Sequence, residues 1–382
     1  MIDIAEYCGY IANLGVDFVT GVPDSLLNDF CCYIEENLDP KRHIIAANEG
    51  NAIAIACGYH LATGGIPMVY MQNSGLGNAM NPLISLTHPE VYAIPMILLI
   101  GWRGDPAIKD HVQHKVQGAL TPITLENLEI PYFILDNDQE DAFHKTKLAY
   151  DTANESGSTV ALIVKKRVLE RGEKDSSLKP SNELPLSREE AISTILEIMP
   201  SDAIYVASTG RITRELHAQR VKRGEPHNRD FLMVGSMGHA SQIALGLALA
   251  KPNRTIVCLD GDAAAIMHMG GMSIIGRACP LNLWHFVLNN GAHESVGGQM
   301  SSGINTDFTT VATACGYATS KTYLTTRQEI AHSVYKLEHS QKPKFFDIRI
   351  HKGIRSGLPA LHVDHKQDKT ILMQEMVREN ND

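Results

Sequence analysis

Two polar turns, Gly261-Asp262 and Asn289-Asn290-Gly291, each follow a short apolar run in this 382-residue sequence. The apolar runs, 255–259 and 283–288, have the length and composition of buried parallel strands. A crossover helix over 264–275 would place both turns at the carboxyl edge of one sheet, where open α/β sheets bind ligands. A carboxylate, an amide oxygen and the Gly291 carbonyl would then offer three hard oxygen ligands, which suit Mg²⁺ on a diphosphate. The alternative is that Asp and Asn are ordinary turn residues.

The helix predicted after Asp262 begins with Ala263-Ala264. Such small side chains leave the N-terminal amides of a helix open to phosphate oxygens. The spacing of the two turns, with a predicted strand before each, favours the diphosphate interpretation over the turn interpretation.

Three polar turns also interrupt the first part of the chain, after predicted strands at 16–20, 43–47 and 66–72. Asp24 and Ser25 precede a predicted helix at 26–37, where either residue would cap the helix or face a substrate. Glu49 precedes a helix of small residues at 51–63, and the helix dipole alone would favour a carboxylate there. A Gly-rich turn, 73–78, follows the third strand.

The same plan recurs in the second part of the chain, where Gly238-His239 opens a small-residue helix at 242–250 before the strand at 255–259. The repeated pattern predicts an α/β fold with two doubly wound parallel-sheet domains of similar topology. We expect domains at 1–170 and 187–382, joined by a polar linker at 171–186. The polar tail, 352–382, is either a solvated end or a lid. Further elements are predicted as strands at 96–100, 132–135, 160–164, 203–207 and 345–350 and a helix at 188–199.

Composition places the chain among ordinary globular proteins, with 44% hydrophobic and 20% charged residues. The net charge of −9 argues against nucleic acid as the main partner. Seven cysteines follow no metal or disulfide spacing. We see no secretory signal and no apolar run that would span a membrane, so we expect a cytoplasmic enzyme.

Several segments resemble the thiamine diphosphate-dependent decarboxylases, above all the phosphonopyruvate decarboxylases, with the sulfopyruvate decarboxylases as near relatives. They include T-G-V-P-D-S-L-L (20–27), N-E-G-N-A (48–52), V-G-S-M-G-H-A-S-Q (234–242) and L-N-N-G-A-H-E-S-V-G-G-Q (288–299). The sequence differs from the usual family pattern at Ala263, which stands for a glycine, at His111-Val112, and at Leu358 in the tail.

This resemblance implies a pyrimidine-binding domain at 1–170, a diphosphate-binding domain at 187–382 and no middle domain. It implies thiamine diphosphate and Mg²⁺ as cofactors, and active sites at the subunit interface of a homodimer or higher homo-oligomer. Asp262, Asn289 and the Gly291 carbonyl would bind the metal. Glu49 would contact N1′ of the aminopyrimidine. The other implied cofactor contacts are Ser208, Thr209, Gly210, Gly235, Ser236, Met237, His239, Gly261, Ala263, Ala264, Ala292 and His293, although capping or packing would also explain His239.

By the same resemblance, Asp24, Ser25, Gln113 and His114 would act at the reacting carbon of a small anionic 2-oxo acid. Cations able to meet a second anionic group are Arg103, Lys109, Lys115, Arg211, Arg214 and Arg355. The implied reaction is decarboxylation of 3-phosphonopyruvate to phosphonoacetaldehyde and CO₂. Alternatives are another 2-oxo acid such as sulfopyruvate, carboligation to an acceptor aldehyde, and a cofactor-binding protein without catalysis.

Overall fold

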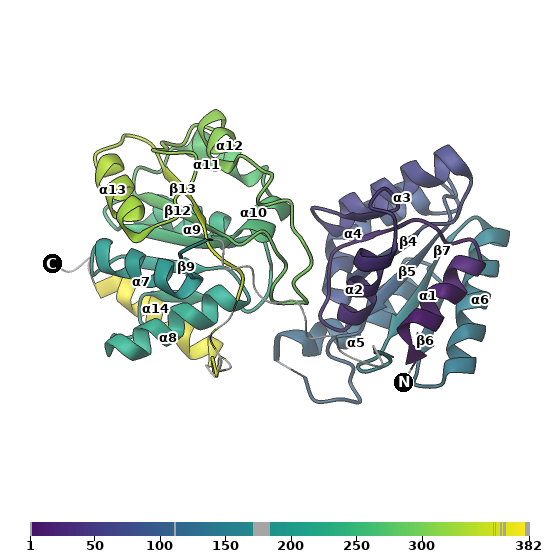
Figure 1. The fold of residues 1–382 in the computed structure, drawn as a ribbon. Coiled ribbons are helices and arrows are strands. Elements are labelled where there is room, and N and C mark those ends of the chain that lie inside the picture. Colours follow the sequence, from purple (N-terminus) through teal and green to yellow (C-terminus); the bar gives the residue numbers. More distant parts are fainter. Residues whose placement is uncertain are drawn as a thin grey trace. The chain divides into compact units, whose positions relative to one another are not determined.

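A computed structural model describes residues 2–110, 112–170, 184–353, 355, 357–359, 361 and 364–378. The chain divides into two compact units (Figure 1). Unit 1 comprises Met1–Ser177 and Ser295–Gln299, and unit 2 comprises Leu178–Glu294 and Met300–Asp382. Most of the predicted linker, 171–183, and residue His111 lie outside the described residues.

Unit 1 is built on a six-stranded sheet in which every neighbouring pair is parallel. The strand order is β3-β2-β4-β5-β7-β6. The strands β5 and β7 are buried along their whole length and mostly apolar, as expected for strands that helices cover on both faces. The strands are β2 (Val19–Gly21), β3 (His43–Ile45), β4 (Met68–Gln72), β5 (Met96–Gly101), β6 (Tyr132–Leu135) and β7 (Thr159–Val164), and a separate pair joins β1 (Ile2–Asp3) to β8 (Leu169–Glu170).

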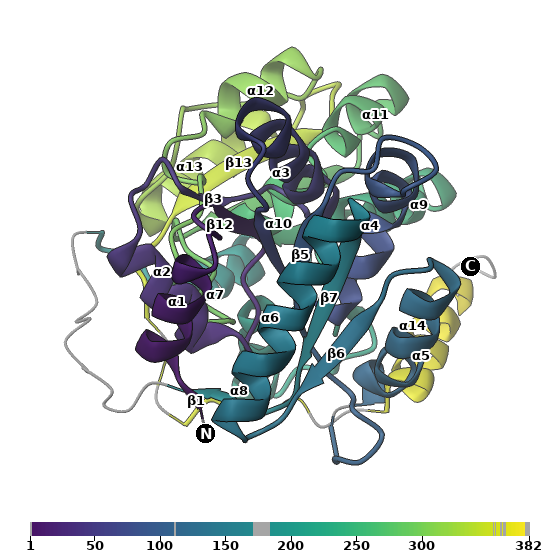
Figure 2. The same ribbon diagram turned by 90° about the vertical axis from the view of Figure 1, so that its right-hand side faces the viewer.

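Two groups of helices enclose the sheet of unit 1 (Figure 2). One face packs against α1 (Ile4–Asn13), α2 (Asn28–Asn37) and α6 (Gln139–Ser156). The other face packs against α3 (Glu49–Thr63), α4 (Leu76–Pro82) and α5 (Val112–Asn127), with the short turns η1 (Asn73–Gly75) and η2 (Leu83–Thr87) beside α4. Unit 1 is therefore a three-layer α/β/α domain with a core on each side of its sheet.

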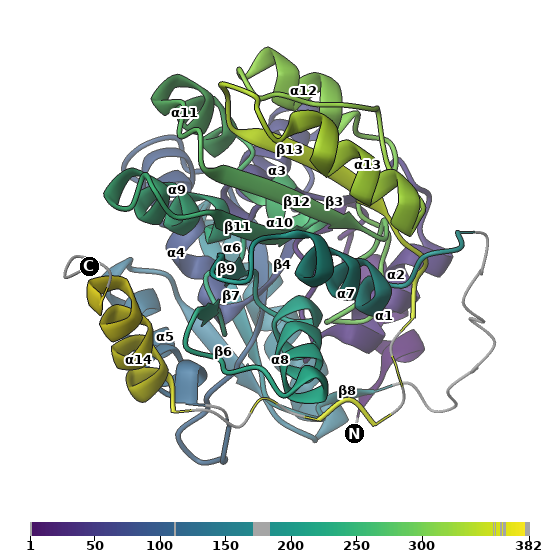
Figure 3. The ribbon, with the colours of Figure 1, turned by 90° about the vertical axis from the view of Figure 1, so that its left-hand side faces the viewer.

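Unit 2 contains a five-stranded parallel sheet with the order β10-β9-β11-β12-β13. Its strands are β9 (Ile204–Ala207), β10 (Asp230–Leu232), β11 (Ile256–Gly261), β12 (Leu283–Asn289) and β13 (Lys344–Arg349). One face packs against α7 (Arg188–Ile198), α8 (Arg211–Arg223) and α13 (Arg327–Leu337), and the other against α9 (Ala240–Ala250), α11 (Gly271–Ala278), α12 (Phe308–Ala314) and α14 (His365–Arg378) (Figure 3). The predicted fold class, two parallel-sheet α/β domains without a middle domain, is confirmed.

Three local predictions differ from the structure. The crossover segment after Asp262 forms two short helices, α10 (Asp262–Met267) and α11, because Gly270-Gly271 interrupts it and glycine weakens a helix interior. The first helix, α1, was not predicted. The tail is not simply a solvated end. Its helix α14 packs on unit 2, because Leu372 and Met376 are buried in the unit 2 core. No helix among the described residues is both long and apolar enough to cross a membrane.

His43 provides a test of the packing of unit 1. Its Nε2 lies 2.9 Å from the Tyr70 hydroxyl, and burial lowers the pKa of His43 to about 4. The unfolded chain therefore takes up the proton first, and the free energy of unfolding should fall by at most ~3 kcal/mol between pH ~6.5 and ~4. Urea unfolding of His43→Gln at several pH values should show a flatter pH dependence than the parent protein. An identical slope in both proteins would contradict this assignment.

Candidate active site

The candidate residues lie near the switch point of each sheet, the point from which successive strands are added in opposite directions. In unit 1 the chain moves from β2 to β3 on one side and from β4 to β5 on the other, so β2 and β4 flank the switch point. In unit 2, β9 and β11 flank the equivalent point. Parallel α/β sheets bind ligands at the carboxyl ends of such strands. The loops that carry Asp24, Ser208 and Asp262 follow β2, β9 and β11 at these ends, and the other predicted site residues follow the neighbouring strands β3, β5, β10 and β12.

Asp24, just beyond β2, is fully buried beside the neighbouring strand. Its carboxylate accepts hydrogen bonds from Gln72 Nε2 at 2.7 Å and from the Leu26 amide at 3.1 Å. Burial raises its pKa above the ordinary value, partly offset by these hydrogen bonds and by Arg103. Asp24 does not cap α2, whose N-terminus has no side-chain cap. The structure instead makes Asp24 a buried carboxylate held at the switch point.

The guanidinium of Arg103 lies near the Asp24 carboxylate. Arg103 donates to both oxygens of Asp110, at 2.9 and 2.8 Å, and its third nitrogen donates to Ser25 Oγ at 3.0 Å. This bidentate geometry orients the guanidinium. Of the other candidate cations in unit 1, Lys109 lines a small pocket that Asp110 also lines, whereas Lys115 is exposed on α5. The structure thus brings Ser25 and Arg103 together next to Asp24.

Gln113 and His114 lie in the first turns of α5 and are partly buried. Trp102 Nε1 donates to the Gly118 carbonyl at 2.8 Å, which ties α5 to the loop after β5. The backbones approach so closely that a Cβ on Gly118 would lie 1.7 Å from the Gly104 carbonyl oxygen, and one on Gly104 would lie 2.0 Å from that of His114. These two glycines therefore set the position of the α5 N-terminus.

Glu49 is the first residue of α3 and is only 6% exposed. Asn48 caps the helix, and its side chain accepts from the Asn51 amide at 2.9 Å. Because Asn48 serves as the cap, capping does not account for Glu49. The Glu49 carboxylate instead accepts from Asn78 Nδ2 at 2.7 Å and borders Gly75, where an added Cβ would lie 2.5 Å from Glu49 Oε1.

Replacement of Gly75 should therefore act through Glu49. In Gly75→Ala, the new methyl group must displace the Glu49 carboxylate. We expect turnover to fall by roughly 10- to 100-fold, since general acid–base catalysis depends on position and supplies about 10²–10⁴-fold. Gly77→Ala is the matched control, because a Cβ at Gly77 meets nothing within 4 Å. Equal kcat values for the two variants and the parent protein would contradict the proposed role of Glu49.

In unit 2, three turns assemble the predicted diphosphate side of the site. Ser208, Thr209 and Gly210 lead from β9 into α8, and Gly210 has a positive φ of 102° that favours glycine. Gly235, Ser236 and Met237 precede α9; Met237 is partly buried and Ser236 has a positive φ of 52°. His239 is exposed, and its ring lies 4.4 Å from that of His268. Gly261 is the last residue of β11, and Ala263 and Ala264 lie in the first turn of α10.

The predicted metal ligands also converge. Asp262 is 2% exposed and Asn289 is fully buried. A Cβ on Gly303 would lie 2.2 Å from Asp262 Oδ2 and 2.8 Å from Asn289 Oδ1, so both oxygens border the same point. The Asn289 amide donates to the Gly303 carbonyl at 3.0 Å and to Asp347 Oδ1 at 3.2 Å. Gly291, at φ 66°, accepts at its carbonyl from the Ser301 amide at 3.0 Å.

The charge of this cluster fits a divalent cation. Burial raises the pKa of Asp262 to about 6 and that of Asp347 to about 7, and Asp262 adds to the shift at Asp347. A dication beside the Asp262 carboxylate would relieve this cost, and carboxylate, amide and carbonyl oxygens are the ligands that Mg²⁺ takes. The residues present therefore fit the predicted metal.

An ion-pair network holds the turn at 290–294, which follows the predicted metal ligand Asn289. Arg188 donates to Glu294 at 2.7 Å and pairs with Glu215 at 3.0 and 2.9 Å. Glu294 also accepts from Asn290 Nδ2 at 3.0 Å. Ala292 is buried, and burial lowers the pKa of His293 to about 4. Arg355 pairs with Glu189 at 3.3 Å, so that candidate cation has a partner.

Sequence reasoning missed several residues that support the site. Gln72 could have been identified from the sequence, because a polar residue at the carboxyl end of a buried strand lies at the edge of the sheet where ligands bind. No sequence pattern indicates the contacts of Asn78, Gly303 and Asp347, because these contacts join residues far apart in the chain.

Comparison with known families agrees with the fold. Residues 8–123 match the thiamine pyrophosphate enzyme N-terminal TPP binding domain, and residues 209–348 match the C-terminal TPP binding domain of the same enzymes. The chain belongs to the thiamine pyrophosphate enzyme family.

Among its relatives, a phosphonopyruvate decarboxylase of Streptomyces viridochromogenes is 34% identical over 83% of this chain and 81% of its own length. A phosphonopyruvate decarboxylase of Streptomyces hygroscopicus is 32% identical over 83% of this chain and 80% of its own length. A sulfopyruvate decarboxylase of Methanosarcina acetivorans is 30% identical, with 79% of each chain covered.

Proposed function

We propose that this protein decarboxylates 3-phosphonopyruvate to phosphonoacetaldehyde and CO₂, with thiamine diphosphate and Mg²⁺ as cofactors. The observation that carries the proposal is 34% identity to a phosphonopyruvate decarboxylase over most of both chains, and this chain has Glu49, Asp262 and Asn289 where the family resemblance implies cofactor and metal contacts. Sulfopyruvate is the second candidate substrate, because a sulfopyruvate decarboxylase matches at 30% identity over 79% of the chain.

The proposed cofactor contacts follow the positions of the turns. Asp262, Asn289 and the Gly291 carbonyl would hold Mg²⁺ on the diphosphate, lined by the turns at 208–210, 235–239 and 261–264. Met237 would pack against the cofactor, and Glu49 would hold a proton at the pyrimidine ring. When bound, thiamine diphosphate supplies a carbon nucleophile and an electron sink for the departing CO₂. The protein supplies position, charge and exclusion of water.

At the substrate end, the buried Asp24 is supported as a proton carrier by its raised pKa. Its fixed partner Gln72 orients the carboxyl group. His114 and Gln113, on the α5 N-terminus, complete the proposed catalytic set. Ser25 and Arg103, which already share a hydrogen bond, offer donors to the anionic group on the substrate's third carbon.

We also propose that the protein works as a homodimer or larger homo-oligomer. Apolar side chains are exposed on and after the helices α3 and α4 of unit 1, with Leu61 at 74%, Ile84 at 46% and Tyr92 at 68%. Exposed apolar residues grouped on adjoining elements are typical of subunit interfaces. Analytical ultracentrifugation tests this proposal: a monomer that keeps full activity at assay concentration would contradict it.

The function is tested by measuring aldehyde release from 3-phosphonopyruvate, sulfopyruvate and pyruvate, with and without thiamine diphosphate and Mg²⁺. We expect cofactor-dependent release from 3-phosphonopyruvate, with kcat/KM at least about 100-fold above that for pyruvate, since a buried charge-assisted contact contributes about 2–3 kcal/mol. Added acceptor aldehyde separates carboligation from simple release. Preference for sulfopyruvate would reassign the substrate, and no turnover of any 2-oxo acid would overturn the proposal.

A further inference from the structure

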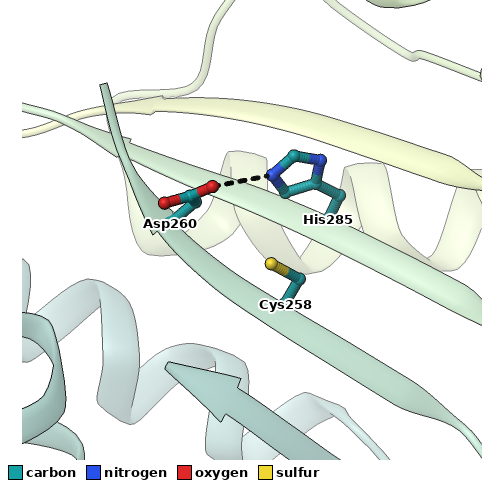
Figure 4. Close-up of side chains that lie close together, drawn as sticks. All are labelled: Cys258, Asp260 and His285. Atoms are coloured by element: carbon teal, nitrogen blue, oxygen red, sulfur yellow. Dashed lines mark ion pairs between the residues drawn. The ribbon is translucent and has the colours of Figure 1, made fainter. Parts of the chain in front are cut away.

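Beneath the proposed magnesium site, the unit 2 core contains three potential metal ligands on one face of the sheet (Figure 4). Cys258 and Asp260 are two residues apart on β11, so their side chains point to the same face. His285 is the register partner of Cys258 on β12 and therefore lies on that face too. Their ligand atoms all lie within 4.8 Å of one another, and His285 Nε2 lies 3.6 Å from Asp260 Oδ2.

All three side chains are withdrawn from solvent: Cys258 is 0%, Asp260 1% and His285 1% exposed. Neither ring nitrogen of His285 has a hydrogen-bond partner among the described residues. The hydroxyl of Tyr317, itself 1% exposed, also has none within the described part of the chain. The tyrosine ring lies 6.2 Å from the His285 ring. Buried polar atoms without partners cost free energy, so such a cluster requires an ordered water or ion.

From this cluster we infer a second metal site, distinct from the magnesium site, in which Cys258, Asp260 and His285 bind a transition-metal ion of the Zn²⁺ class. Thiolate, imidazole and carboxylate are the ligands that Zn²⁺ takes, at about 2.0–2.3 Å, whereas Mg²⁺ prefers oxygen alone. A water or the hydroxyl of Tyr317, whose ring lies 6.2 Å from the His285 ring, would supply the fourth group. The inference does not depend on the proposed substrate.

Charge balance favours the same ion. Binding would displace the proton of the Cys258 thiol to solvent, leaving one thiolate and one carboxylate around a dication. The assembly carries no net charge, which makes its burial less costly than burial of Asp260 alone. The ion would link β11 to β12 directly below the turns that carry Asp262 and Asn289. Because the cluster is fully buried, the metal would enter during folding and exchange slowly.

The test begins with the whole protein, produced in zinc-supplemented medium and dialysed against EDTA under native conditions to remove Mg²⁺ and surface-bound ions. Mass spectrometry of the metals should find about one zinc per chain. Cys258→Ser and His285→Gln should each lower the zinc content at least fivefold. Cys279→Ser and His332→Gln, which alter exposed residues, are the matched controls and should retain it.

Cobalt gives a spectroscopic readout that the parent protein should show without any substitution. Protein produced with Co²⁺ should show a thiolate-to-cobalt charge-transfer band, and Asp262→Asn should retain that band because it alters only the magnesium site. Less than one-tenth of a transition metal per chain after growth in zinc and in cobalt would overturn the inference and leave water as the occupant of the cluster. Loss of the cobalt band in Asp262→Asn would also overturn the inference, because the metal would then not occupy a site separate from Asp262.

Discussion

Glu49→Gln should abolish turnover while leaving the fold intact. Glutamine has nearly the same shape but cannot hold a proton as a carboxyl group does, so the loss removes a general acid–base contribution of about 10²–10⁴-fold in kcat. The helix dipole at the start of α3 would lose only ~0.3–1 kcal/mol of favourable interaction. Single-turnover kinetics with the proposed substrate measures the effect, and circular dichroism verifies the fold.

A matched control for this substitution exists in the same unit. Glu140 is an exposed glutamate in the first turn of α6, so Glu140→Gln makes the same change in the first turn of another helix. It should leave kcat within about twofold, as expected for a surface substitution. If Glu49→Gln turned over as fast as Glu140→Gln, the proposed role of Glu49 would be wrong.

The second large effect is expected at Asp262. Asp262→Asn keeps the size of the side chain but removes the charge that fits a divalent ion in the buried cluster with Asp347 and Asn289. We expect the affinity for thiamine diphosphate in the presence of Mg²⁺ to fall at least about 100-fold, which corresponds to ~2.7 kcal/mol. Isothermal titration calorimetry measures this affinity, and the melting-temperature rise on addition of both ligands should disappear.

Two comparisons make this experiment specific. Asp202→Asn removes an exposed carboxylate of the same unit and should bind the cofactor as the parent protein does. The unliganded Asp262→Asn protein should be no less stable than the parent, because the substitution removes a buried charge whose pKa is already raised. Unchanged calorimetric affinity would exclude Asp262 as a ligand of the proposed Mg²⁺.

The sequence alone was sufficient to predict the fold class. Uninterrupted apolar runs such as Met96–Ile100 and Val160–Val164 are typical of strands buried on both faces, and the structure places both at the centre of a parallel sheet. The spacing of Asp262 and Asn289 around a crossover predicted that they would meet at one sheet edge, since adjacent parallel strands end together. Of the predicted site turns, those after β2, β4, β9 and β11 lie at the switch points, and the others follow neighbouring strands of the same sheets.

Tertiary structure decided the remainder, because the relevant contacts join residues far apart in the chain. Three contacts depend on which elements become neighbours. They are the hydrogen bond between Asp24 and Gln72, the hydrogen bond between Asn78 and Glu49, and the approach of Gly303 to both predicted metal ligands. The same reason explains the cluster beneath the site: the spacing of the seven cysteines indicated no metal site, yet strand register brings His285 beside Cys258 and Asp260. Sequence periodicity predicts which face a side chain occupies, but only the pairing of strands determines what lies opposite it.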